Sequence, residues 1–261
     1  MKRILTLVLA LLMILTFVAC QAEENTEGTT TTTTTTPKRT DPIDPGTDPE
    51  GEEDEGYDVD VYIPYGTPVV DGVRDPIWDT AVPCPLELIM MDAPQATVTA
   101  YSLWDNEHLY FFFDIKDADV AQDGTEGDWH NDGIYLYISE DNNFGISSFD
   151  QYSGGTYQFA IINEELTLLP RKGEDNIGAE NYQVSVNIVE DGITIEFGYK
   201  PQFLTMEGGS QFTLDYQYND CTSGATRLGC LSWYRMTDGD ASPMSMGIAQ
   251  LVAEGESIPQ D

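Results

Sequence analysis

From residue 57 onward, apolar and polar residues alternate along much of the chain, and this two-residue period predicts β-strands. The segment 131–138 is the clearest example, because aliphatic residues fall on one face while Tyr135 and Tyr137 fall on the other. Turn-forming pairs such as Asp191-Gly192 separate the alternating runs and predict tight hairpins. The predicted strands lie at about 97–104, 108–115, 131–138, 155–163, 182–189, 192–199, 210–219, 228–235 and 245–252.

Helical periodicity is nearly absent from the same region. No apolar stretch keeps a 3.6-residue period for long, so the pattern predicts only short helical turns, at Asp75–Thr80 and Pro201–Met206. The segment 108–115 differs from the other strands because both of its faces are apolar, which predicts a central strand covered on both sides. Many short antiparallel strands joined by turns predict an all-β fold, an antiparallel β-sandwich of the jelly-roll-like type.

The N-terminal residues 1–20 have the pattern of a targeting segment. Lys2 and Arg3 precede an apolar run shorter than the ~20 residues needed to span a bilayer, which predicts a signal peptide. The run ends in FVAC, residues 17–20, which resembles the bacterial lipobox, where the cysteine is lipidated and becomes the new N-terminus. We therefore expect Cys20 to be a lipid anchor that holds the protein in the membrane, on the extracellular face of the bacterial cell. Ordinary secretion with an unmodified Cys20 is the alternative.

The rest of the chain divides by composition. Residues 21–56 contain a run of threonines followed by a tract rich in Pro, Asp, Glu and Gly, with almost no large apolar side chain. Such a segment cannot bury enough apolar surface to offset the entropy of ordering, so a disordered linker is expected. Residues 57–254 are then expected to form one β-sandwich domain, followed by a C-terminal tail at 255–261.

The charge balance excludes some partners. The formal net charge is −35, with 46 acidic against 11 basic residues, and the sequence contains no basic patch that could neutralise phosphates. Nucleic acid is therefore not an expected partner, whereas cations are.

Three cysteines remain once Cys20 is assigned to the lipid. Cys221 and Cys230 flank a glycine-containing loop with a spacing that a hairpin could close, and an extracellular location permits a disulfide. Two reduced thiols are the equal alternative, and Cys84 has no partner in either case.

Two of the predicted strands carry side chains that suit a sugar. One strand presents aromatic rings where small or charged groups normally face solvent, and the other presents a row of amide and carboxylate groups. The C–H faces of a pyranose stack on aromatic rings, and its hydroxyls bind amides and carboxylates. The pattern predicts a sugar site on an uncovered sheet face; the alternative is that the loops 139–156 or 236–246 cover the rings. The residues concerned are Tyr135, Tyr137, Asp215, Gln217 and Asn219.

Several short motifs follow one another along the chain. The most specific are D-G-x-x-D-x-x-W at 71–78, L-W-D-x-x-x-L-Y at 103–110 and W-x-x-D at 129–132. They lie within the segments 65–81, 96–120, 128–143, 182–200 and 231–251. Together these segments resemble the family 9 carbohydrate-binding module, a β-sandwich appended to secreted xylanases.

The resemblance implies a module that holds a sugar between two tryptophans. Trp129 matches the first tryptophan, and Gln217 and Asn219 match polar contacts of the family. The second tryptophan would fall near Asp240 and is missing, and Tyr135 stands where the family has a sugar-binding Glu. Half of the clamp is therefore replaced. His130, beside Trp129, is a further candidate partner for sugar hydroxyls.

The resemblance also implies structural calcium. The acidic stretch 114–128 supplies Asp117, Asp119, Asp123 and Asp128, and calcium binds six to eight oxygens in a flexible geometry. We expect these four aspartates to be calcium ligands, with a solvated acidic surface as the alternative.

Catalysis is not predicted, because no pair of carboxylates stands out for glycoside hydrolysis and no nucleophile motif is present. The function that we predict is non-catalytic carbohydrate binding by a surface-anchored lipoprotein, supporting the capture or breakdown of polysaccharide with a glycoside hydrolase as partner. A surface adhesion or assembly subunit that has dropped the sugar is the first alternative. A haem-binding β-sandwich, using His130 with Met244 or Met246, is the second.

Overall fold

The computed structural model describes residues 57–92, 94–122, 131–140, 154–162, 165–169, 181–222, 226–234 and 245–259. Across these ranges the chain is β-structure apart from turns and the 3-10 helix η1 (Pro76–Thr80). Within these ranges, no helix is long and apolar enough to cross a membrane. The predicted signal peptide, with Cys20, and the predicted linker 21–56 lie outside the described residues.

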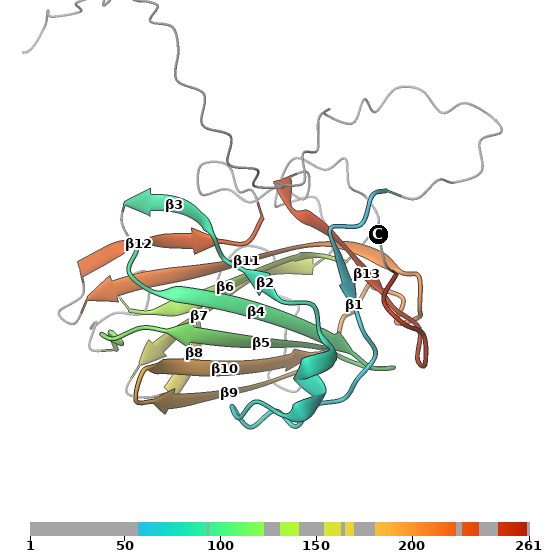
Figure 1. Cartoon of the computed structure of the whole chain (residues 1–261), viewed down its shortest axis with the longest axis horizontal. Helices are drawn as coiled ribbons and strands as arrows, with labels where there is room; N and C mark the ends of the chain where they lie inside the picture. The colour runs from blue at the N-terminus through green and yellow to red at the C-terminus, as the bar shows by residue number, and fades with distance from the viewer. Residues whose placement is uncertain are drawn as a thin grey trace, which may run out of the picture. The chain divides into compact units, whose positions relative to one another are not determined.

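Two sheets contain all of the described strands (Figure 1). In the eight-stranded sheet the order is β1, β13, β11, β6, β7 and β8, while β12 pairs with the C-terminal part of β11 and β3 pairs with β12. Its strands are β1 (Val61–Ile63), β3 (Leu88–Asp92), β6 (Gly133–Ser139), β7 (Gly154–Ile162), β8 (Glu165–Leu169), β11 (Gln211–Thr222), β12 (Thr226–Ser232) and β13 (Gly247–Leu251).

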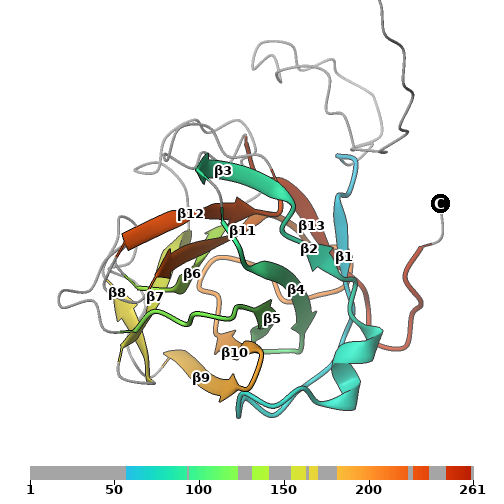
Figure 2. The same cartoon turned by 60° about the vertical axis from the view of Figure 1, so that its left-hand side comes forward.

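The five-stranded sheet has the order β2, β4, β5, β10 and β9. Its strands are β2 (Cys84–Pro85), β4 (Thr97–Trp104), β5 (Leu109–Lys116), β9 (Tyr182–Val189) and β10 (Gly192–Tyr199). Neighbouring strands are antiparallel in both sheets, except that β1 is parallel to β13. Turning the molecule separates the layer of β4, β5, β10 and β9 from the layer that contains β11 and β6 (Figure 2). The prediction of an antiparallel β-sandwich is confirmed.

The main core fills the space between the sheets, where the inward faces of their central strands meet. Phe113 of β5 packs edge-on against Tyr216 of β11, with ring centroids 5.7 Å apart and planes at 83°. The aliphatic face predicted for 131–138 is part of this core, because Ile134, Leu136 and Ile138 of β6 are fully buried.

A second apolar cluster covers the outer face of the five-stranded sheet. Phe112 of β5 is fully buried there and packs against Trp78 of η1, with ring centroids 5.5 Å apart. The prediction that β5 is covered on both sides is therefore confirmed. Gly72 lies beside this cluster with φ of 83°, a left-handed conformation that favours glycine, and a Cβ there would lie 3.2 Å from Asn187 and Ser185.

One buried carboxylate fastens η1 and its preceding loop to the sheet. Glu196 of β10 is fully buried and accepts hydrogen bonds from Asp71 N at 2.8 Å, Gly72 N at 2.7 Å and Trp78 Nε1 at 2.8 Å. The D-G-x-x-D-x-x-W motif is thus a structural device, since its glycine turn and its tryptophan both donate to the same glutamate.

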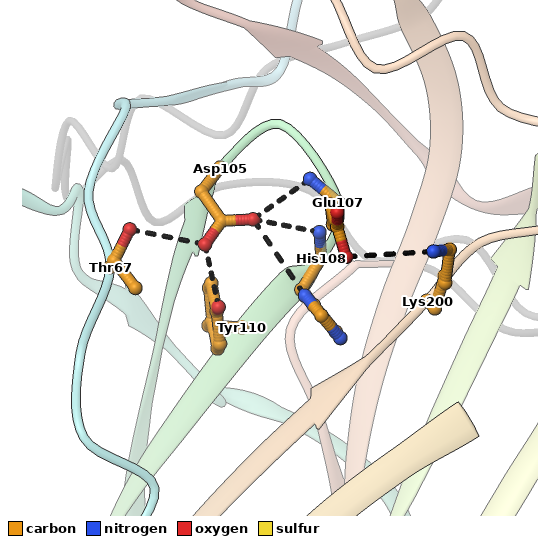
Figure 3. A network of polar contacts seen from close by, with 6 residues as sticks. All are labelled: Thr67, Asp105, Glu107, His108, Tyr110 and Lys200. Carbon is orange, nitrogen blue, oxygen red and sulfur yellow. Dashed lines mark hydrogen bonds and ion pairs between the residues drawn. The ribbon is translucent and has the colours of Figure 1, made fainter. Parts of the chain in front are cut away.

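The β4–β5 turn is organised around a second acid (Figure 3). Asp105 Oδ1 accepts from the backbone N–H groups of Glu107 and His108, both at 2.9 Å. Its Oδ2 accepts from Tyr110 Oη at 2.7 Å and from Thr67 Oγ1 at 3.1 Å. Burial alone would raise the pKa of Asp105, but these hydrogen bonds outweigh it and lower the pKa.

Sequence patterns missed several short elements and gave one wrong helix. The strands β1, β2, β3 and β8 were not predicted, because runs of two to five residues show little alternation. The segment 201–206 is not helical: Glu140 Oε2 accepts from the N–H groups of Gln202 and Phe203 at 2.7 Å each, and this carboxylate, not a helical turn, satisfies them.

Candidate functional site

The register between β6 and β11 brings the predicted sugar-site residues together. Tyr137 lies directly opposite Asp215, and Tyr135 lies opposite Gln217. Opposed residues share a face in an antiparallel pair, and this face is the one turned away from the core. We call the side chains of Tyr135, Tyr137, Asp215, Gln217 and Asn219 the β6–β11 face. The prediction that the rings and the polar row share a sheet face is confirmed.

Within the β6–β11 face, the rings and amides contact one another. The rings of Tyr135 and Tyr137 stack with centroids 6.2 Å apart and planes at 7°. Tyr137 Oη donates to Gln217 Oε1 at 3.2 Å. Asn219 Nδ2 donates to the carbonyl oxygen of Asn131 at 2.9 Å, so this face is also fixed to the residue that precedes β6 by two positions.

The expectation that these rings are uncovered is wrong. Tyr135 and Tyr137 are each only 4% exposed, Gln217 is 7% exposed, and Asn219 is 1% exposed. Alternation places the tyrosines correctly on the outer face, but it carries no information about what lies over that face. The two rings therefore act as a packed, rigid layer and not as a solvent-facing platform.

Asp215 uses its carboxylate within the fold. Its oxygens accept from Tyr234 N at 2.9 Å, from Tyr216 N at 2.8 Å and from Ser232 Oγ at 3.1 Å. Complete burial raises the pKa of Asp215 to about 7, although these hydrogen bonds act in the opposite direction. Asp215 thus anchors the end of β12 to β11, and its contact with sugar stays a prediction.

Two further predicted sugar-binding residues, Trp129 and His130, lie outside the described residues. The residues that follow them are well anchored. Asn131 accepts from Asn219, as above, and the backbone N–H of Asp132 donates to the carbonyl of Ala121 at 2.9 Å.

A cluster of three aspartates occupies one end of the core. Carboxylate oxygens of Asp117, Asp132 and Asp220 all lie within 4.8 Å of one another, and the three side chains are buried or nearly so. We call these residues the aspartate cluster. They come from the ends of β5, β6 and β11, three strands that are distant in sequence.

The aspartate cluster shares one residue with the predicted calcium ligands, which stay a prediction. Asp117 belongs to it, but Asp119 is not one of its three members and donates its backbone N–H to Asp117 Oδ1 at 2.9 Å. Asp123 and Asp128 lie outside the described residues. Asp132 and Asp220 are not among the predicted ligands, because that prediction rests on acids that are close together in the sequence.

A sequence signal for the missed residues does exist. Asp117 continues the core-facing positions of β5 after Ile115, and Asp220 continues those of β11 after Tyr218. Asp132 likewise precedes Ile134 on the core-facing side of β6. An acid on the apolar side of an alternating run is costly to bury. Three such acids that meet in space therefore indicate a common site.

The electrostatics of the aspartate cluster favour a bound cation. Burial, together with the charges of Asp117 and Asp220, raises the pKa of Asp132 to about 8, against the backbone N–H bonds from Cys221 and Ala121. None of the three carboxylates makes an ion pair in the described part of the chain. An all-oxygen, acidic donor set fits calcium and does not fit zinc, which prefers sulfur and nitrogen.

The cysteines are reduced thiols in the structure. Cys84, Cys221 and Cys230 are all buried and none is bonded to another, so the predicted Cys221–Cys230 disulfide is wrong and the reduced alternative holds. The reason is register: Cys230 lies opposite Asn219, and an irregularity after Asp220 places Cys221 opposite Arg227. The two cysteines are therefore not cross-strand partners, and diagonal positions are about 7–8 Å apart, beyond the usual disulfide span.

Comparison with solved structures identifies the class of fold. Two structures of a family 9 carbohydrate-binding module from Caldicellulosiruptor kristjanssonii, one in complex with cellotriose and one with glucose, match with a TM-score of 0.62 each. They are 19% and 20% identical to this chain and cover 77% of it, and the match takes in 98% and 99% of their own chains. The fold is that of a carbohydrate-binding-module β-sandwich.

Sequence comparison gives the family. Endo-1,4-beta-xylanase A of Thermotoga neapolitana is 26% identical over 193 residues, and exoglucanase XynX of Acetivibrio thermocellus is 24% identical over 169 residues. These matches cover 72% and 65% of this chain but only 17% and 15% of the two enzymes. The profile of the carbohydrate family 9 binding domain-like family matches residues 70–254, and the chain belongs to that family.

Proposed function

We propose that this chain binds a glucan- or xylan-type saccharide without catalysis, at the outer side of β6 and β11. The observation that carries the proposal is the β6–β11 register, which sets stacked tyrosines beside amide side chains. Family membership supports it, as do the solved modules with cellotriose and glucose.

The buried tyrosines have a supporting role in this proposal. Tyr135 and Tyr137 form a rigid floor, and Trp129 supplies the ring on which the sugar stacks. The anchoring of Asn131 to Asn219 supports this assignment, because it fixes the backbone two residues after Trp129 to the β6–β11 face.

The test uses the full chain with cellotriose and glucose as probes. Trp129→Ala should weaken cellotriose binding at least about fivefold, because a stacked ring contributes on the order of 1 kcal/mol or more. Phe203→Ala is the matched control, since Phe203 is 54% exposed and lies outside this face. Equal binding by the two variants, with unchanged melting temperatures, would contradict the proposed site. A folded wild type that binds no saccharide in a glycan panel would favour the adhesion or assembly subunit.

We also propose a calcium ion at the aspartate cluster. Asp117, Asp132 and Asp220 would hold it, and the two positive charges of the ion would offset most of the repulsion among the three carboxylates. Its expected contribution is to stability, because the cluster closes one end of the core and does not lie on the β6–β11 face.

The cellular setting is a proposal that rests on sequence. We propose that Cys20 carries a lipid and that the linker 21–56 presents the sandwich at the cell surface, where it acts beside a glycoside hydrolase. The xylanase and exoglucanase relatives support the enzyme partner, because in them the matching region is a small part of a longer chain. Cys20→Ser should move the protein from the membrane fraction to the medium.

A further inference from the structure

Strand β3 forms a free edge of the eight-stranded sheet. It pairs with β12 on one side, and no described strand pairs with its other side. Figure 2 shows β3 at the margin of the sheet, beyond β12. An unpaired strand edge presents backbone N–H and C=O groups that can pair with another chain.

Residues 88–91 of β3 are apolar, and three of these four side chains are exposed. Leu88 is 37% exposed, Ile89 64% and Met91 42%, and Met90 between them is half-buried. Four consecutive apolar residues on an open edge are unusual in a chain with 46 acidic residues, because charges normally protect such edges.

Register divides this apolar run between the two faces of the sheet. Leu88 and Met91 lie opposite Ser232 and Cys230, so they extend the outer side of the sheet. Ile89 lies opposite Leu231 and extends the core layer past the point where the sandwich covers it. A further strand added beside β3 would bury apolar surface on both faces.

The charges at the two ends of β3 indicate which kind of strand could pair with its free edge. Glu87 and Asp92 bracket the apolar run. If a second copy paired antiparallel with β3, centred on Ile89 and Met90, each Glu87 would stand opposite an Asp92. Like charges directly opposed in a strand pair are destabilising.

We propose that β3 is a docking edge for an extended segment of another protein, with an apolar centre and a basic residue at each end. The segment adds as an antiparallel strand: its backbone pairs with β3, its apolar residues cover Ile89 and Met91, and its basic ends lie at the two ends of β3, where the sequence has Glu87 and Asp92. This surface is separate from the proposed carbohydrate site, so the two proposals can fail independently.

The experiment uses the full chain and two synthetic peptides with the same alternating valine–threonine centre, one flanked by lysines and one by glutamates. Fluorescence anisotropy at low salt should show at least about tenfold tighter binding of the lysine-flanked peptide. Ile89→Lys should abolish that preference. Ile188→Lys is the matched control, because Ile188 is also an apolar residue, 37% exposed, on the edge strand β9 of the other sheet, and it should leave binding unchanged.

Three results would overturn the proposal. The first is equal binding of both peptides, and the second is equal loss in the two lysine variants. The third is concentration-dependent dimerisation that Ile89→Lys removes, which would make a second copy the occupant. If Ile89→Lys lowers the melting temperature more than Ile188→Lys does, hydrogen exchange on the wild type decides: the lysine-flanked peptide should slow exchange at 88–92 and not at 182–189.

Discussion

Two buried acidic sites in this sandwich differ in how the cost of burying a carboxylate is offset. Glu196 stands alone on the outer side of the five-stranded sheet, and three N–H donors surround it. In the aspartate cluster, Asp117, Asp132 and Asp220 each accept two hydrogen bonds, but their charges face one another.

The two sites differ in whether other carboxylates lie beside the buried one. Three N–H donors offset part of the cost of burying a single carboxylate, although burial still raises the pKa of Glu196. Glu196 thereby serves as a latch for the loop and helix that cover β5. Three carboxylates within 4.8 Å of one another repel, and the donors cannot remove that repulsion. The first arrangement is held by donors from the protein, whereas the repulsion in the second supports the calcium ion that we propose there.

The largest effect is expected at the latch. Glu196→Ala should lower the free energy of unfolding by about 3–5 kcal/mol, because it leaves Trp78 Nε1 and the N–H groups of Asp71 and Gly72 buried without an acceptor. Urea denaturation measures it, and calcium should not change the loss. Glu196→Gln keeps one acceptor and should cost clearly less; equal losses would show that shape and not hydrogen bonding holds this region.

The next effect tests the aspartate cluster. Removing calcium with EDTA should lower the stability of the wild type by about 3 kcal/mol relative to saturating calcium, as expected for an ion at ~100 times its Kd. Differential scanning calorimetry of the full chain measures it. Asp132→Asn should remove most of the EDTA response, whereas Asp119→Asn should keep it, because Asp119 is not part of the cluster. An EDTA response that persists in full in Asp132→Asn would place the ion elsewhere.

Asp215 offers a smaller effect that depends on pH. Burial raises its folded-state pKa to about 7 from an ordinary 3.8, so the folded chain retains a proton that the unfolded chain has released. The stability that this proton provides is fully present below about pH 4 and is lost as the pH rises through about 7. Between pH 5 and pH 7 the loss is about 2 kcal/mol.

The comparison of wild type with Asp215→Asn isolates that loss. Urea denaturation across this pH range should show a decline that is about 2 kcal/mol shallower in the variant, because asparagine does not titrate. Parallel pH profiles for the two proteins would mean that the carboxylate of Asp215 is ionised throughout.

The smallest effect is expected at an exposed acid. Glu107 Oε2 lies 3.5 Å from Lys200 Nζ, and both side chains are more than half exposed (Figure 3). Lys200→Ala should change the free energy of unfolding by less than about 0.5 kcal/mol, because water screens such a pair. A loss above about 1 kcal/mol would show that burial is not what separates this acid from Glu196.

Much of the strand pattern was readable from sequence. The runs at 97–104, 182–189 and 192–199 coincide with β4, β9 and β10, because each combines clean alternation with turn residues at its ends. The short strands carried no such signal, and Pro201 suggested a helical turn whose N–H groups are in fact satisfied by Glu140.

The candidate site was predictable only in part. Alternation correctly placed Tyr135, Tyr137, Gln217 and Asn219 on one outer face, and the register between β6 and β11 joined them. Their burial was not predictable, and neither was the aspartate cluster, which the core-facing positions of Asp117, Asp132 and Asp220 signalled only in retrospect.

The sequence by itself determined which side of each strand is apolar, where the hairpins turn and which family the motifs resemble. It could do so because side-chain direction in a strand has a period of two and turns have local chemistry. Only the tertiary structure decided which faces are covered, which residue lies opposite each thiol of the β11–β12 pair and which acids meet. Those outcomes depend on the lateral order and register of strands distant in the chain, and no local pattern contains them.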